Sequence, residues 1–211
     1  AHIEAGIRSN DLTMPEEINR MVTDSITDYF FTTSETANQN LKNLGISENR
    51  IFFVGNTMID SLLRNINNFY KPIIWDKYKL KKNKYIVLTL HRPANVDQEK
   101  SLKMMLESIS KNADNIKLVF PVHPRTRNKL EKIKLNDKNL ILSDPLPYFE
   151  FNFLVKNSLG VITDSGGITE ETTVLGIPCI TVRDNTERPE TVEIGTNVLV
   201  GTNPNKIKPV L

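Results

Sequence analysis

The stretch GVITDSGGITEE, residues 160–171, decides the fold of this chain. Val161 and Ile162 belong to an apolar run typical of a buried strand, and a helical pattern follows Gly166 and Gly167. Glycine at a strand-to-helix turn costs backbone entropy, so it indicates a positive φ angle or an object packed against the main chain. If that object is an anion, the free N–H groups and the positive end of the helix dipole bind it. The stretch therefore predicts a strand, a glycine turn and a helix that form an anion site.

Strand-like runs of this kind alternate with amphipathic helical runs along nearly the whole chain. The alternation predicts an α/β fold, in which helices cover both faces of a mostly parallel sheet. The expected strands are residues 28–32, 51–55, 85–90, 116–121, 139–143, 160–163, 179–182 and 197–201. The basic, proline-containing stretch 68–84 interrupts the alternation and is predicted to be a linker or a surface excursion.

Two of the expected helices carry start signals. One begins at Pro15 and runs to residue 26, and Thr57 with Asp60 resembles a capping box for another. The apolar stripe of the first helix consists of Ile18, Met21, Val22 and Ile26. A stripe at this spacing predicts a helix face that packs against the core.

Length and composition narrow the class of protein. With 211 residues and 39% hydrophobic content, the chain can bury the core of one large domain or of parts of two. A formal net charge of +2 is too balanced for a nucleic-acid binder that works by counterion release. No membrane-length apolar stretch and no signal peptide is recognisable, so we expect a cytoplasmic protein without membrane or nucleic-acid partners. The single cysteine, Cys179, is expected to be a buried thiol.

Polar and charged residues follow the expected strands. They include His91 and Arg92, His123 and Arg125, Ser143 and Asp144, Asp164 and Ser165, and Arg183 and Asp184. Because the carboxyl ends of parallel strands share one rim, we expect these side chains to gather there as a phosphate or diphosphate pocket. Taken singly, a glycine pair is also ordinary loop geometry, and a histidine is also a structural group. Glu170 and Glu171 are helix formers favoured by the dipole, or one of them binds a sugar hydroxyl.

Several motifs are missing from the sequence. The patterns GxxxxGK[ST] and GxGxxG do not occur, which argues against a P-loop ATPase and against an NAD-type site. No cluster of histidine, cysteine and aspartate has metal-ligand spacing, so we expect no metal and no cofactor.

A second group of charged residues lies in HIEAGIRSNDLTMPEEINR, residues 2–20. Glu4 is expected at the end of a short strand, with Glu16 and Glu17 in the first turn of a helix and Arg20 as the i,i+4 partner of Glu16. For one of the two adjacent glutamates, the expected role is only to complement the helix dipole. Separated carboxylates that converge on one cleft also fit general acid and base catalysis.

Seven motifs occur in order over nearly the whole chain: HIEAGIRS, PEEINR, GNTMIDSLL, TLHRPANVD, PVHPRT, TDSGGITEE and RDNTERPETVEIGTNVLVGT. In these motifs the chain resembles the nonphosphorylating UDP-N-acetylglucosamine 2-epimerase family, which interconverts UDP-GlcNAc and UDP-ManNAc. The resemblance implies the GT-B architecture of two Rossmann-like domains with the nucleotide between them. Residues 1–55 resemble the end of the first domain, and residues 56–211 resemble most of the second. It also implies a homodimer, a glycine-rich loop and an acidic residue before Ala1, and closing helices after Leu211.

The resemblance implies roles for particular residues. Removal of the C2 proton promotes anti elimination of UDP to 2-acetamidoglucal, and UDP adds again after protonation from the other face. Glu4 and Glu16 match the acid and base positions, and His91 matches a histidine that stabilises the departing diphosphate. The expected substrate-binding residues are Arg92, His123, Phe151 near the uracil, Ser165, Gly166 and Gly167 on the diphosphate, Glu171 on the ribose, and Arg188.

Other functions remain open on the sequence. A relative that acts on a diacetamido sugar, a hydrolysing form, a GT-B glycosyltransferase and a non-catalytic UDP-sugar sensor share much of this pattern. The chain also departs from the family at HRPAN, where many members have HRRE or HRAEN, so a glutamate after the His-Arg pair is absent. In some bacterial members the region that matches His123 contributes to an activating second UDP-GlcNAc site.

Overall fold

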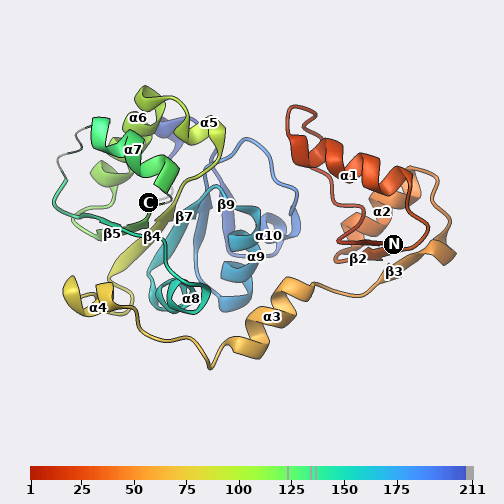
Figure 1. The fold of residues 1–211 in the computed structure, drawn as a ribbon, viewed down its shortest axis with the longest axis horizontal. Coiled ribbons are helices and arrows are strands. Elements are labelled where there is room, and N and C mark those ends of the chain that lie inside the picture. The colour runs from red at the N-terminus through yellow and green to blue at the C-terminus, as the bar shows by residue number, and fades with distance from the viewer. Residues whose placement is uncertain (123, 134, 136, 208–211) are drawn as a thin grey trace. The chain divides into compact units, whose positions relative to one another are not determined.

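The computed structural model describes residues 1–122, 124–133, 135 and 137–207. These residues form two compact units, one of residues 1–64 with 185–188 and one of residues 65–184 with 189 onward. We describe each unit by itself, with the element labels of Figure 1. Among the described residues, no helix combines the length and the apolar character that crossing a membrane requires.

The first unit contains a three-stranded parallel sheet in the order β1-β2-β3. Its elements are β1 (His2–Ile3), α1 (Pro15–Ser25), β2 (Phe30–Thr32), α2 (Glu35–Asn43), a 3-10 turn (Glu48–Arg50), β3 (Ile51–Phe53) and α3 (Thr57–Asn65), which ends at the junction. Ala5, Phe30 and Leu41 form its buried core. Alternation of strand and helix therefore gives parallel pairing here, as the sequence predicts.

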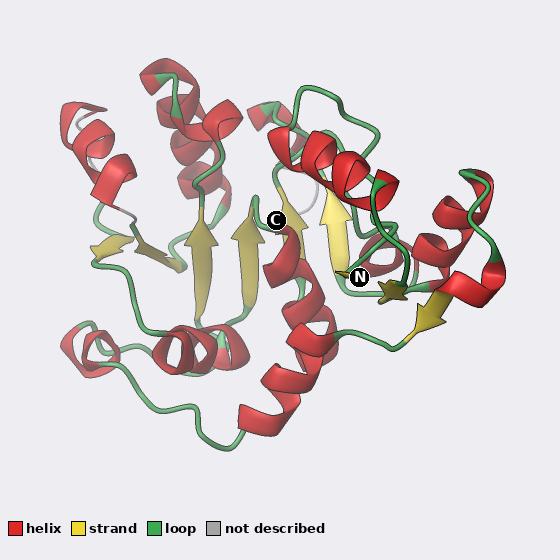
Figure 2. Cartoon of the chain, turned by 45° about the vertical axis from the view of Figure 1, so that its right-hand side comes forward, coloured by secondary structure: helices red, strands yellow, loops and turns green. Residues whose placement is uncertain are grey.

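The second unit contains a six-stranded parallel sheet in the order β6-β5-β4-β7-β8-β9. Its strands are β4 (Tyr85–Thr89), β5 (Lys117–Pro121), β6 (Leu140–Ser143), β7 (Gly160–Thr163), β8 (Cys179–Thr181) and β9 (Asn197–Leu199). Its helices are α4 (Ile73–Lys77), α5 (Pro93–Val96), α6 (Glu99–Asn112), α7 (Pro124–Ile133), α8 (Tyr148–Asn157), α9 (Gly166–Leu175) and α10 (Glu190–Glu193), with a 3-10 turn at Pro204–Lys206. Figure 2 shows the strands in yellow, with the central arrows pointing the same way.

Helices cover both faces of this second sheet. On one face, apolar residues of α6 and α7 pack with Ile86, Leu118 and Phe120. On the other face, residues of α4, α8 and α9 pack with Val87 and Val119. Each of the eight strands expected from the sequence is present, so the α/β prediction is confirmed.

The single cysteine lies in this core. Cys179 begins β8 and is buried, and burial raises the pKa of its thiol to about 11. A thiol with that pKa remains protonated near neutral pH, and protonated thiols are poor nucleophiles. The expectation of a buried thiol is confirmed.

Local expectations fail at two points in the chain. The cap of α3 is Asn56, whose Oδ1 accepts the N–H groups of Met58 at 3.0 Å and Ile59 at 3.3 Å, so the predicted Thr57 capping box is wrong. The stretch 68–84 contains α4, and Trp75 packs edge-on against Tyr85 and Phe153. This stretch is therefore anchored in the core by an aromatic side chain that its basic composition obscures.

The apolar stripe of α1 is not buried. Its members are exposed, by 42% at Ile18 and 80% at Ile26. The buried positions of α1 are Glu17 and Asp24, seven residues apart on one face. The helix packs through hydrogen-bonded carboxylates, so the prediction from the stripe is wrong for this helix.

Gly6 occupies a position that no other residue fits. Its φ is +76°, and an added Cβ would lie 2.5 Å from the Ala37 carbonyl oxygen and 2.8 Å from Leu41 Cγ. We expect Gly6→Ala to cost the first unit about 3 kcal/mol, because a backbone clash adds to the left-handed conformation. Hydrogen exchange of residues 1–64 measures this loss.

Gly45→Ala is the matched control for that variant. Gly45 has a φ of +81°, but nothing lies within 4 Å of an added Cβ. We therefore expect a cost of only about 1 kcal/mol, from the left-handed conformation alone. Equal costs for the two variants would contradict the clash at Gly6.

Candidate active site

The glycine turn that follows β7 forms the N-terminus of α9. Ser165 is the N-cap residue, its N–H donates to Thr163 Oγ1 at 3.0 Å, and its side chain caps no helix amide. Gly166 and Gly167 are the first helical residues, and neither has a positive φ. A positive φ angle therefore does not explain the glycines at this turn. The explanation that remains is a ligand that packs closely against the main chain. The first N–H groups of a helix have no partner within it, so they are the donors available at this turn.

Asp164 is the hydrogen-bonding centre of the rim. Its side chain is fully buried between β7 and α9. Its carboxylate accepts the N–H of His91 at 3.1 Å, the N–H of Arg92 at 2.9 Å and Nδ2 of Asn95 at 3.0 Å. Burial alone would raise the pKa of Asp164, but hydrogen bonds from His91, Asn95 and Arg92 outweigh it and lower that pKa. The carboxylate therefore remains ionised inside the protein.

The imidazole of His91 is attached to this carboxylate. Its Nδ1 lies 3.0 Å from Asp164 Oδ1, while the side chain as a whole is 55% exposed. The hydrogen bond to Asp164 raises the pKa of His91, and burial, Arg92 and Arg183 partly oppose that rise. An ionised carboxylate can only accept, so Nδ1 carries the proton and Nε2 is the nitrogen left for a ligand.

Arg92 is fixed at the same turn. Its Nε donates to the Asp164 carbonyl oxygen at 3.0 Å, in addition to the main-chain contact of Arg92 with the Asp164 carboxylate. The guanidinium is thus placed at the carboxyl end of β7, beside the N-terminus of α9. A cation there adds to the positive potential of the helix end.

A cavity of about 290 Å³ lies at the carboxyl ends of β4, β5 and β6. Its lining brings His91 together with Phe151 of α8 and Ile168 of α9. The other lining residues are Thr89, Leu90, Pro121, Pro145 and Leu146. One polar, partly exposed imidazole against apolar and aromatic walls is the usual composition of a small-molecule site.

Glu171 is the sixth residue of α9 and lies in the second turn of that helix. It is 6% exposed, and its Oε1 accepts the Tyr148 hydroxyl at 2.9 Å. Burial raises the pKa of Glu171, and the hydrogen bond from Tyr148 only partly offsets that rise. Sequence reasoning missed Tyr148, although its place at the start of an aromatic helix, YFEF, was a signal. His123 lies outside the described residues.

In the first unit, Glu4 stands directly after β1 in a strained conformation. Its φ is +65°, a region that residues other than glycine seldom adopt. Arg188, which is 6% exposed, donates from Nη2 to Glu4 Oε1 at 3.1 Å and from Nη1 to Thr33 Oγ1 at 3.1 Å. Residues 185–188 belong to this unit, so a residue distant in sequence fixes the Glu4 carboxylate.

The adjacent glutamates of α1 have different surroundings. Glu17 is 1% exposed and accepts the N–H of Ser9 at 2.9 Å and the N–H of Asn10 at 3.2 Å. Arg20 pairs with Glu17 at 3.4 Å, so the predicted pairing of Arg20 with Glu16 is wrong. The exposed Glu16 is on the solvent side of the helix start. Glu17 is therefore the structural member of the pair.

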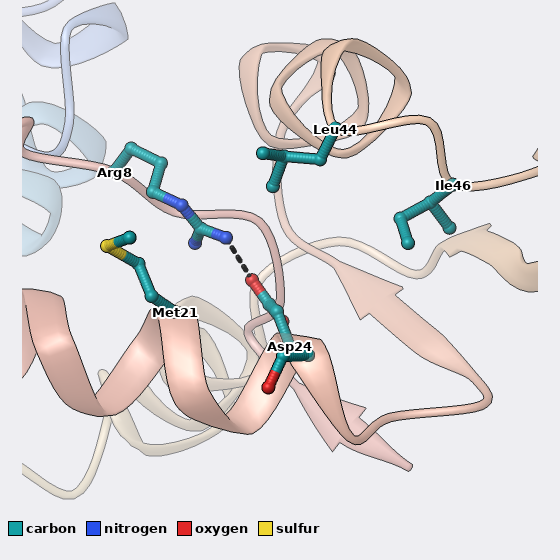
Figure 3. A pocket seen from close by; sticks show the side chains of 6 residues that line it. Arg8, Met21, Asp24, Leu44 and Ile46 are labelled. Carbon is teal, nitrogen blue, oxygen red and sulfur yellow. Dashed lines mark hydrogen bonds and ion pairs between the residues drawn. The ribbon is translucent and has the colours of Figure 1, made fainter.

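A second polar cluster supports the same loop. Asp24 of α1 accepts from Nη2 of Arg8, from Nδ1 of His2 at 2.6 Å and from the N–H of Gly6 at 3.3 Å. Figure 3 shows the Arg8–Asp24 pair in a cavity of about 270 Å³ whose walls include Met21 and Leu44. The cluster ties residues 2–8, and hence Glu4, to α1.

Comparison with known proteins identifies relatives of the whole chain. A family model described as UDP-N-acetylglucosamine 2-epimerase matches residues 1–210. A UDP-N-acetylglucosamine 2-epimerase of Methanocaldococcus jannaschii is 44% identical over 98% of this chain, which spans 59% of that relative. A UDP-2,3-diacetamido-2,3-dideoxy-D-glucuronate 2-epimerase of Pseudomonas aeruginosa is 40% identical over 95% of this chain and 56% of its own.

Solved structures agree with this result. The crystal structure of the Methanocaldococcus jannaschii UDP-GlcNAc 2-epimerase in complex with UDP-GlcNAc and UDP matches 99% of this chain and 60% of its own, with a TM-score of 0.88. A Staphylococcus aureus co-structure of MnaA with UDP gives a TM-score of 0.88 at 33% identity. These neighbours are of the GT-B type, so the expected fold class is confirmed. The chain belongs to the UDP-N-acetylglucosamine 2-epimerase family.

Proposed function

We propose that this protein interconverts UDP-GlcNAc and UDP-ManNAc. The observation that carries the proposal is the cavity in which His91, held by Asp164, lies with Phe151 beside the N-terminus of α9. Amide donors and an imidazolium suit a diphosphate, and an aromatic wall suits a nucleobase. The relatives named above supply the reaction class.

The proposed reaction needs no oxidant and no metal. A base removes the proton from C2 of the sugar while the C1–O bond to UDP breaks, which gives 2-acetamidoglucal and UDP. An acid then delivers a proton to C2 from the opposite face, and UDP adds back to C1. Glu4 and Glu16 supply the base and the acid. His91 stabilises the negative charge that grows on the leaving diphosphate.

The substrate contacts form the second part of the proposal. The N–H groups of Gly166 and Gly167 bind the diphosphate together with Ser165. Phe151 packs near the uracil, and Glu171, which Tyr148 orients, accepts from the ribose hydroxyls. Three further residues, Arg92, His123 and Arg188, are proposed to contact the substrate. For Arg188 the contact with Glu4 also supports a role in orienting that carboxylate.

Isotope exchange tests the reaction. We expect the full-length protein, incubated with UDP-GlcNAc in D2O, to place deuterium at C2 of both UDP-GlcNAc and UDP-ManNAc. NMR and mass spectrometry of the two epimers measure the label. Epimerisation that retains the original C2 hydrogen would contradict the elimination mechanism, and the absence of a UDP-ManNAc product would contradict the proposed function.

One alternative substrate has a specific observation in its favour. The Pseudomonas aeruginosa relative, at 40% identity, is named for a diacetamido sugar substrate. Parallel incubations with UDP-GlcNAc and with the diacetamido UDP-sugar separate the two, since the better substrate shows the higher kcat/KM. Free ManNAc would indicate a hydrolysing form, and turnover only with an added acceptor would indicate a glycosyltransferase.

Three further features belong to the proposal. The domain boundary at residues 55–56 and the homodimer follow from the family resemblance, and the cytoplasmic location follows from the sequence features described above. The role in making cell-surface polysaccharide follows from the proposed product, an activated amino sugar. Sedimentation of the purified protein tests the dimer.

A further inference from the structure

We infer that Asp164 is a positioning residue for the reaction proposed above: it holds the His91 imidazole in one orientation with Nδ1 protonated and leaves Nε2 for the departing diphosphate. Asp164 itself touches no substrate atom in this scheme. The inference rests on the proposed function for the identity of the ligand, whereas the orientation and charge of His91 can be measured without it.

The first argument is geometric. The Asp164 carboxylate accepts the main-chain N–H groups of His91 and Arg92 as well as the His91 side chain, so it fixes both ends of that residue. Asn95 binds the same carboxylate and also the Val182 carbonyl oxygen, each at 3.0 Å. Three residues of the segment after β4 therefore hold one carboxylate from the turn after β7, and Asn95 is itself fixed by the end of β8, so the carboxylate has little freedom to rotate.

The second argument concerns strand order. β4 and β7 are neighbours, with Thr89 paired to Thr163, and the hydroxyls of these two residues lie 2.6 Å apart. Asp164 follows Thr163 directly, and His91 follows Thr89 after one intervening residue, Leu90. The sheet register therefore sets the distance between the imidazole and the carboxylate, and the rigid strands maintain it.

The third argument concerns charge. The charged groups that act on His91 are Asp164, which raises its pKa, and Arg92 and Arg183, which lower it. Without Asp164 the two guanidinium groups would favour a neutral ring. With Asp164 the ring remains a cation to higher pH, and a cation stabilises the charge that develops when UDP departs.

A purely structural role for Asp164 predicts different results from a positioning role. Asp164→Asn keeps an oxygen that can accept main-chain N–H groups, but its amide nitrogen cannot accept from His91 Nδ1. We expect kcat to fall about 100-fold, less than with the loss of the imidazole itself, while the KM for UDP-GlcNAc changes less than about threefold. The alkaline limb of the kcat pH profile should move to lower pH.

Asn95→Ala is the matched control, because Asn95 binds the same carboxylate without touching the imidazole. We expect this variant to lose stability and to keep the alkaline limb where the wild type has it. A rise in the KM for UDP-GlcNAc as large as the loss of kcat in Asp164→Asn, with an unmoved limb, would show that Asp164 only maintains the fold, and would overturn the inference.

NMR of the wild-type protein provides a test that needs neither a variant nor catalysis. The 15N shifts of the His91 ring report the tautomer and the pKa in the full chain without nucleotide. We expect the neutral ring to carry its proton on Nδ1 and the pKa to lie above the ordinary value of about 6.5. An Nε2–H tautomer, or a pKa at or below that value, would overturn the inference even if the epimerase activity is confirmed. The expected NMR result without any epimerase activity would contradict only the proposed function.

Discussion

Replacement of His91 by alanine is expected to lower kcat for epimerisation about 1,000-fold, while the KM for UDP-GlcNAc changes less than about threefold. The reason is that the negative charge on which His91 acts develops only during the reaction. In the proposed mechanism, the diphosphate of UDP-GlcNAc is already charged before the C1–O bond breaks, and the helix amides and Arg92 are proposed to bind it. The additional charge appears only as the bond breaks, and the His91 cation acts on it most strongly then.

Steady-state kinetics with UDP-GlcNAc measure the two quantities. His91→Gln keeps a hydrogen-bond donor without a positive charge, so we expect it to recover about tenfold of the lost kcat. Lys71→Ala serves as a surface control. Lys71 forms an exposed ion pair with Asp76, and such a pair contributes little to stability. Both residues precede β4 in the sequence and belong to none of the turns at the rim. If His91→Ala raises the KM for UDP-GlcNAc and leaves kcat unchanged, the imidazole only binds the nucleotide.

Much of the fold could be predicted from the sequence because local patterns determine it. Runs such as residues 85–90 are continuous and apolar, as parallel strands buried on both faces must be. The polar residues after these runs then fall at one edge, because parallel strands end there together. For the same reason, His91 and Ser165 could be proposed as site residues before any coordinates were considered.

The partners of those residues could not be predicted in the same way. Asp164 acts on His91 because β4 lies beside β7, a neighbour relation that skips two strands in the chain. Arg188 reaches Glu4 across more than 180 residues of sequence. Such contacts depend on strand order and on chain crossing, and hydrophobic periodicity carries no information on either.

The α1 helix shows a different limit of sequence reasoning. Its apolar stripe has the correct period, yet the buried face carries Glu17 and Asp24. Hydrophobic spacing predicts which residues share a face, but hydrogen-bond partners decide whether a carboxylate can be buried. Those partners, Ser9 and Arg8 among them, come from the preceding loop.

Glu16→Gln and Glu17→Gln are expected to have opposite effects, although the two residues are adjacent. Glu17 accepts three hydrogen bonds from Ser9 and Asn10 inside the protein, so Glu17→Gln should destabilise the first unit by about 2 kcal/mol. Glu16 is exposed, so Glu16→Gln should change that stability by less than about 0.5 kcal/mol. Because Glu16 is proposed to be the acid or the base, however, Glu16→Gln should lower kcat about 1,000-fold.

Two measurements on the same pair of variants separate these effects. Hydrogen exchange of α1 and of residues 9–10 reports the stability of the first unit, which the only tryptophan, Trp75 of the second unit, does not report. Kinetics at saturating UDP-GlcNAc report kcat. If Glu16→Gln retains full kcat, the general acid or base must be sought elsewhere. If Glu17→Gln leaves α1 as protected as in the wild type, the buried carboxylate does not hold the loop, and the structural role assigned to Glu17 is wrong.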